Sequence, residues 1–121
     1  MAGMRWSGKK VRELLEELSD GQKAFKTKPS GTPVKDAWGY KQHPNGYFSI
    51  EGAYGGWKLV YTLPYSSGQA NVTEGYIPSG KLADKLLTMG RVGMKAKYLD
   101  LQKRHKKRGK EMLEYEKTRR R

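Results

Sequence analysis

The chain has 121 residues and a net charge of +13, with 25 Lys and Arg against 12 Asp and Glu. This length suits a single domain, and the absence of cysteine excludes a disulfide scaffold, a thiolate zinc site and a cysteine nucleophile. No apolar run approaches the roughly 20 residues that a membrane span needs, and the N-terminal residues lack the apolar stretch of a secretory signal. We therefore expect a cytoplasmic or nucleoid-associated protein without a cofactor.

The positive charge is concentrated toward the C-terminus. Residues 1–90 hold 12 Lys and Arg against 8 Asp and Glu, a balance of +4, whereas residues 91–121 hold 13 against 4, a balance of +9. A basic segment attached to a less charged domain has polyanions as its natural partners. We accordingly divide the chain into a compact core, residues 1–93, and a basic helical extension, residues 94–121.

The first element that the sequence predicts is an amphipathic helix over residues 8–20. Its apolar positions recur at helical spacing, at Val11, Leu14, Leu15 and Leu18. Ser7 is the expected N-cap, and Gly21 is the expected left-handed residue that ends the helix. Residues 22–37 then predict a short strand around Phe25 and a lysine-rich loop, for which nucleic-acid contact and plain solubility are equally good interpretations.

Residues 38–77 predict an antiparallel sheet of three to four strands. Asn45–Gly46 lies between two strand-like runs, and because Asn-Gly is a strong signal for a two-residue turn, we expect a hairpin at residues 43–46. The alternation in residues 57–63 puts Trp57 and Tyr61 on one face, where we expect core. Glycines at 52, 55 and 56 indicate a tight turn, since a phosphate-binding loop would lead into a helix. A turn at 65–69 and a last short strand at 71–77 follow.

A short helix is predicted after Pro78, with Ser79 as its N-cap and Gly90 as its end. The residues beyond Gly93 have helix-forming composition, and Met94, Tyr98 and Leu101 are spaced to dock on the core. From Gln102 the apolar stripe fails, so we expect that stretch to project as a solvated helix or to stay disordered. The predicted fold class is α+β, with an N-terminal helix, the sheet, the short helix and a basic C-terminal helix or tail.

Two kinds of side chain indicate nucleic-acid binding. Residues 103–110 contain no acid, and Arg and Lys both bind phosphate. Aromatic rings that alternate with lysines in the sheet region can stack on unpaired bases, although a Leu-poor domain also builds its core from rings. For Tyr40 and Tyr47, exposure and burial are equally good expectations. The residues that we expect to contact nucleic acid are Lys26, Lys28, Lys35, Tyr40, Lys41, Lys58, Lys103, Arg104, Lys106, Lys107, Arg108, Lys110, Arg119, Arg120 and Arg121.

The order of elements resembles that of double-stranded-RNA-binding-like domains, in which a helix, three strands and a helix follow one another. The pieces that carry the resemblance are SGKKVRELLEEL, YKQHPNGYFSI and GYIPSGKLADKLL, all within residues 7–89. The opening helix and the HPNG turn are also similar to HicA-type messenger-RNA-cleaving toxins. The histidine of those toxins is missing here, since Trp38 and Gly39 stand in that stretch. The glycine- and lysine-rich opening that the RNA-binding domains use on their second helix is reduced to Gly80–Lys81.

The favoured function is non-enzymatic binding of DNA or RNA. The basic arm would supply phosphate contacts, and the aromatic, lysine-bearing sheet would supply orientation. We assign no catalytic residue and no metal ligand, because the two histidines are far apart and carboxylates are few. The alternative is a protein-interaction module, an inhibitor or adaptor of a nucleic-acid-handling complex encoded by a virus or mobile element. A third class is a ribonuclease toxin that uses Lys, Arg and Tyr in place of His.

Overall fold

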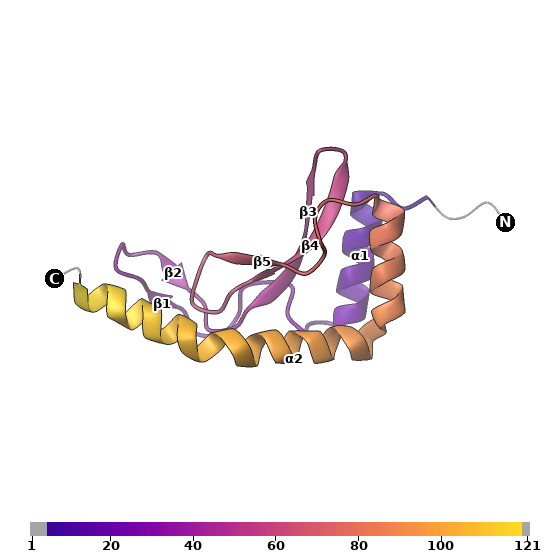
Figure 1. Ribbon diagram of the computed structural model, residues 1–121. Coiled ribbons are helices and arrows are strands. Elements are labelled where there is room, and N and C mark those ends of the chain that lie inside the picture. Colours follow the sequence, from indigo (N-terminus) through magenta and orange to yellow (C-terminus); the bar gives the residue numbers. More distant parts are fainter. Residues whose placement is uncertain (1–4, 120–121) are drawn as a thin grey trace.

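The computed structural model describes residues 5–119, and Figure 1 shows their arrangement. The elements follow one another as α1 (Gly8–Ser19), β1 (Val34–Lys35), β2 (Lys41–Gln42), β3 (Tyr47–Ala53), β4 (Gly56–Thr62), β5 (Gln69–Asn71) and α2 (Ser79–Arg119). The predicted α+β class is therefore confirmed, with an N-terminal helix, small antiparallel sheets and a long C-terminal helix. No helix in the described part of the chain is long and apolar enough to cross a membrane.

Helix α1 forms much as its sequence predicts. The Ser7 hydroxyl accepts a hydrogen bond from the backbone N–H of Lys10 at 3.2 Å, which confirms the N-cap. The helix ends at Asp20, whose φ of 52° is left-handed, one residue before the expected Gly21. The apolar face is buried against the sheet and the start of α2. The Arg91 guanidinium of α2 donates to the carbonyls of Leu18 and Glu17 and so provides hydrogen-bond donors for carbonyl groups in the last turn of α1.

The strands form two separate antiparallel sheets. β3 and β4 pair along their whole length, from Tyr47 opposite Thr62 to Ala53 opposite Gly56, and β5 adds to the other edge of β4. The turn between β3 and β4 consists of Tyr54 and Gly55, both with positive φ, as a two-residue hairpin turn requires. This confirms the tight turn expected in the glycine-rich stretch. β1 and β2 make a small sheet of their own.

The expected hairpin at residues 43–46 is wrong. β2 pairs with β1 before that segment, and β3 pairs with β4 after it. Gly46 serves close packing instead of a turn, because a Cβ on it would lie 2.0 Å from the Tyr61 hydroxyl oxygen. Phe25, expected in a strand, lies outside the strands and is buried in the core. The last strand, expected at residues 71–77, is also misplaced: β5 spans Gln69–Asn71, and beyond it only Ile77 pairs, as an isolated bridge with Trp57.

Helix α2 bends at Gly90, where the backbone takes φ 64° and ψ −178°. We call residues 79–89 the first arm and residues 91–119 the second arm. The first arm lies beside α1, and the second turns sharply and runs beneath the strands (Figure 1). Gly90 therefore ends the short helix as predicted. Ser79 is already helical and is not the N-cap; its hydroxyl donates to the Trp6 carbonyl.

The second arm stays against the protein along its length. Met94, Tyr98 and Leu101 are buried as predicted, and Tyr98 packs edge to face on Phe48 in the core. The expectation that the arm projects into solvent beyond Gln102 is wrong, since Leu113, three turns later, is only 5% exposed. Polar and small residues make many of the contacts between this part of the helix and the core. The spacing of apolar residues therefore does not predict that it is docked.

The Gln102 side chain holds the second arm against the core by hydrogen bonds. Its Oε1 accepts from the Gly46 N–H at 2.8 Å and from the Tyr61 hydroxyl at 2.7 Å, while its Nε2 donates to Asn45 Oδ1 at 3.0 Å. Two turns later, Gly109 lies against the backbone of Pro64, because a Cβ there would come 2.4 Å from the Pro64 carbonyl oxygen. These contacts fix which side of the arm faces solvent.

Candidate nucleic-acid interface

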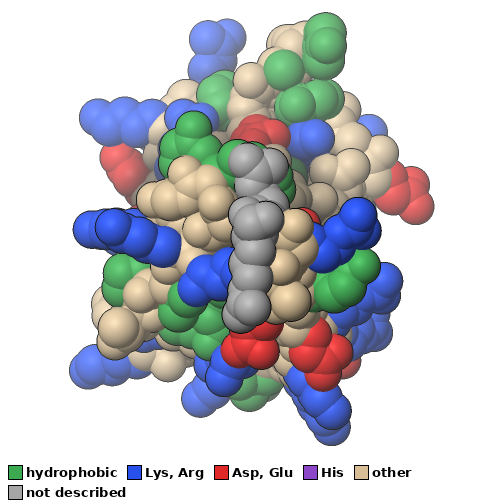
Figure 2. Space-filling model, turned by 90° about the vertical axis from the view of Figure 1, so that its left-hand side faces the viewer, with side chains coloured by type: hydrophobic (Ala, Val, Ile, Leu, Met, Phe, Trp, Pro, Cys, Tyr) green, Lys and Arg blue, Asp and Glu red, His purple; other side chains and the backbone are tan. Residues whose placement is uncertain are grey.

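One exposed side of the second arm carries a row of lysines. The members of this lysine row are Lys103, Lys106, Lys110 and Lys117. Their spacings of three, four and seven residues put them on one side of a helix, over about 21 Å at 1.5 Å per residue. All four are exposed, and no acid occurs between residues 103 and 110. Figure 2, which looks onto the C-terminal end of α2, shows Lys and Arg projecting on both sides of that end.

A basic loop lies beside the lysine row. The Lys106 ammonium is 3.4 Å from Asn45 Oδ1, and Asn45 in turn bonds to Ser30 through its side chain and pairs with it as a β-bridge. These contacts bring the loop that contains the exposed Lys28 to this part of the second arm. Lys26 is directed elsewhere, since its ammonium donates to the Gln22 carbonyl at 3.0 Å.

Beyond Arg91, which binds the end of α1, the second arm has three described arginines; they lie on its other flank, and two of them have a nearby partner. Arg104 forms an exposed ion pair with Asp100 at 2.9 Å, and Arg119 lies 5.8 Å from the ring centre of Tyr115. Lys107 is exposed between the two flanks. The run of cations therefore divides into a lysine flank and an arginine flank with an internal ion pair. The lysine flank has no acid between residues 103 and 110 but includes the exposed Glu114 between Lys110 and Lys117. Arg120 and Arg121 lie outside the described residues.

The tip of the β1–β2 hairpin, residues 36–40, presents two aromatic rings to solvent. Trp38 is 55% exposed and Tyr40 is 70% exposed. The Asp36 carboxylate organises the tip by accepting from the backbone N–H groups of Trp38 and Tyr40, both at 2.9 Å, and from Gln42 Nε2 at 3.1 Å. The hydrogen bond from Gln42, with those from the backbone, holds the pKa of Asp36 below its usual value.

Two lysines flank this tip. Lys35 and Lys41 are directly opposite each other across the β1–β2 pair, and both are exposed. Like charges in directly opposed positions destabilise a sheet, and a bound anion would remove that cost. The hairpin thus combines rings and cations on a tip whose acid is already engaged by hydrogen bonds.

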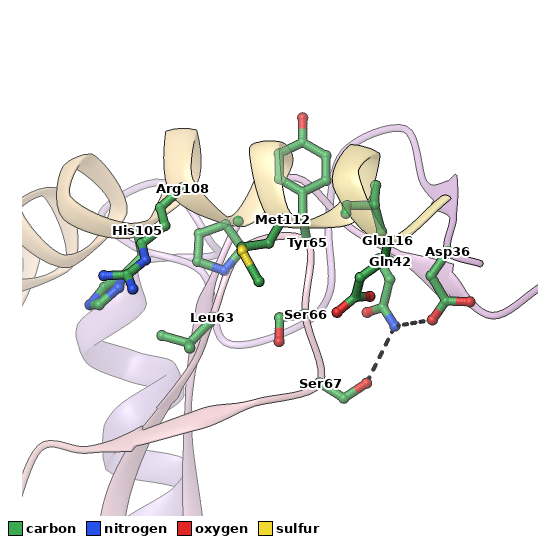
Figure 3. Close-up of a pocket in the computed structure, with 13 residues that line it drawn as sticks. Asp36, Gln42, Leu63, Tyr65, Ser66, Ser67, His105, Arg108, Met112 and Glu116 are labelled. Carbon is green, nitrogen blue, oxygen red and sulfur yellow. Dashed lines mark hydrogen bonds between the residues drawn. The ribbon is translucent and has the colours of Figure 1, made fainter. Parts of the chain in front are cut away.

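A cavity of about 460 Å³ separates this hairpin from the end of the second arm (Figure 3). Asp36 and Gln42 line it from the hairpin, and Arg108, Met112 and Glu116 line it from α2. The loop that follows β4 closes its third side, where Ser67 Oγ lies 3.4 Å from Gln42 Nε2. Because the hairpin and α2 line the same cavity, they form neighbouring parts of one surface.

The structure does not bring every predicted residue to this surface. Lys58 lies on β4 with its ammonium 4.7 Å from the Tyr76 ring centre, near the β3–β4 turn that points away from the second arm in Figure 1. Tyr61 is fully buried, as expected, and Trp57 is half-buried beneath the Arg12 guanidinium.

Two residues of the interface were not among the predicted contacts, namely Trp38 and Lys117. The sequence signal for Trp38 was Asp36 two residues before it, because an aspartate that bonds the backbone two residues on is typical of a tight turn.

Within residues 5–119, no three His, Asp or Glu side chains are grouped so that they could hold a metal ion. Comparisons with protein-family models, with curated proteins and with solved structures found no match to this chain.

Proposed function

We propose that this protein binds nucleic acid without transforming it, and that the lysine row of the second arm makes the phosphate contacts. The observation that carries the proposal is the row itself, four exposed lysines on one side of a helix that is fixed to the core along an adjacent side. Because the core holds the arm, its cations stand at set spacings before a ligand arrives. Lys28 adds charge to the same flank, and the contacts carry no sequence information.

Phosphate binding by such a row has a measurable signature. Each neutralised phosphate releases condensed counterions, so that affinity falls with salt by about 0.9 logarithmic units per contact on duplex DNA and about 0.7 on a single strand. Four contacts therefore give a slope of about −2.8 to −3.6 in a plot of log K against log salt concentration.

The experiment measures fluorescence anisotropy of a labelled 20-nucleotide oligonucleotide at several salt concentrations. The test variant changes every lysine of the row to glutamine. The control removes the same charge from the other end of the molecule, at four exposed lysines: Lys9, Lys10, Lys81 and Lys85. We expect the test variant to lose most of its affinity and of its salt slope, while the control keeps both. Equal losses in the two variants would show that net charge alone acts, and would refute a site on the second arm.

A further inference from the structure

We infer that the β1–β2 hairpin is a stacking site for unpaired bases, so that the protein prefers single-stranded nucleic acid to a duplex. This inference rests on the proposed function and names its ligand. Trp38 and Tyr40 expose more than half of their surfaces on one short tip. In a duplex the faces of the bases are covered by their neighbours, whereas an unpaired base offers its face to an aromatic ring.

The hairpin tip is ordered before any ligand binds. The Asp36 carboxylate fixes the two backbone N–H groups next to the rings, Asp36 N–H donates to the Tyr40 carbonyl at 2.8 Å, and Gly39 N–H donates to the Asp36 carbonyl at 3.1 Å. Gly39 takes a φ of 87°, which a residue with a side chain rarely adopts. A rigid tip loses less conformational entropy on binding, so that more of the stacking energy appears as affinity.

The charges around the tip favour a polyanion over a neutral or cationic partner. Lys35 and Lys41 are directly opposite each other, and the carboxylate of the neighbouring Asp36 accepts three hydrogen bonds within the hairpin. A strand whose bases stack on the rings would place its phosphates near these lysines. The adjoining cavity lies between the hairpin and the second arm; Arg108 lines it, and so do the acids Asp36 and Glu116.

The test compares a single-stranded oligothymidylate of 15 nucleotides with a blunt duplex of 15 base pairs, using the full chain. We expect Trp38→Ala and Tyr40→Ala each to weaken single-strand binding about fivefold or more, with a change in duplex binding of less than about twofold. Tyr54→Asn is the matched control. Tyr54 is 94% exposed at the tip of the other hairpin, and asparagine tolerates its left-handed backbone, so both affinities should stay unchanged.

A spectroscopic measurement separates stacking from loss of local structure. Of the three tryptophans, Trp6 and Trp57 are half-buried and Trp38 is exposed, so stacking on Trp38 should quench its part of the fluorescence. Trp38→Phe keeps a ring and should retain most of the single-strand affinity while it abolishes the quench. If the chain binds the two ligands equally and Trp38→Ala does not change this, the stacking site is refuted. The proposed phosphate contacts of the lysine row are not refuted by that result. Failure of the unaltered chain to bind either ligand would refute the proposed function, and this inference with it.

Discussion

Replacing Gln102 by leucine should destabilise the whole fold, although the residue lies on an extension that the sequence predicts to be solvated. The substitution leaves the Tyr61 hydroxyl and the Gly46 N–H without their acceptor, and both residues are buried. An unsatisfied buried polar group costs about 1–3 kcal/mol, so the two together cost about 2–6 kcal/mol. The free energy of unfolding of a domain this size is about 5–15 kcal/mol, and the loss is a large share of it.

Urea unfolding followed by circular dichroism measures this loss. Lys103→Leu is the control, because Lys103 is the exposed neighbour of Gln102 and its replacement should change the unfolding free energy by less than about 0.5 kcal/mol. Tyr61→Phe added to Gln102→Leu removes one of the unpaired groups, so the double variant should be more stable than the sum of the single losses implies. A Gln102→Leu chain as stable as the unaltered one would show that the second arm is not fastened here.

Three other outcomes follow from the same structure. Gly109→Val should lower the unfolding free energy by about 1–3 kcal/mol, since its side chain meets the Pro64 backbone, whereas Gly80→Ala in open space should not; equal stability of the two variants would contradict the close approach. Burial raises the pKa of Tyr98 to about 12, so the stability that it contributes is present below pH 10 and is lost as the pH rises toward 12. Absorbance at 295 nm, compared with that of Tyr98→Phe, should show this late ionisation, and a normal ionisation near pH 10 would contradict it. The pKa of Asp36 is lowered, so the hairpin tip should stay ordered at pH 3.8 and be lost only as the pH falls through the lower value. Backbone amide shifts of Trp38 and Tyr40 that titrate at or above pH 3.8 would count against this.

The elements that depend on local patterns could be predicted from the sequence. The apolar spacing of α1, its serine cap, and the glycine that ends the first arm of α2 are all found where the residues indicate them. These features are set by helix geometry and by backbone preferences within a few residues. The basic character of the second arm is likewise visible in composition.

The features that depend on distant contacts could not be predicted. Gly46 follows an asparagine and therefore indicates a turn, yet its missing side chain makes room for Tyr61, fifteen residues away. Gln102 and Gly109 are not apolar, yet they dock the second arm through hydrogen bonds and close backbone approach. Helical spacing alone divides the cations into two flanks, but which sides of the helix stay exposed depends on this docking, because a free helix has no preferred side. The sequence therefore names the phosphate-binding residue types but not the surface that they form.

The docking of the second arm also determines when this fold can be completed during synthesis. Tyr98 covers Phe48 and Tyr61, and the Tyr61 hydroxyl donates its hydrogen bond to Gln102 Oε1. A ribosome delivers residues in order at about 5–20 per second, so the sheet emerges seconds before the helix that closes it. Until then its rings are open to water and to other chains. We expect nascent chains stalled before Gln102 to be sensitive to protease across β3 and β4, and chains that have released Leu113 to be resistant.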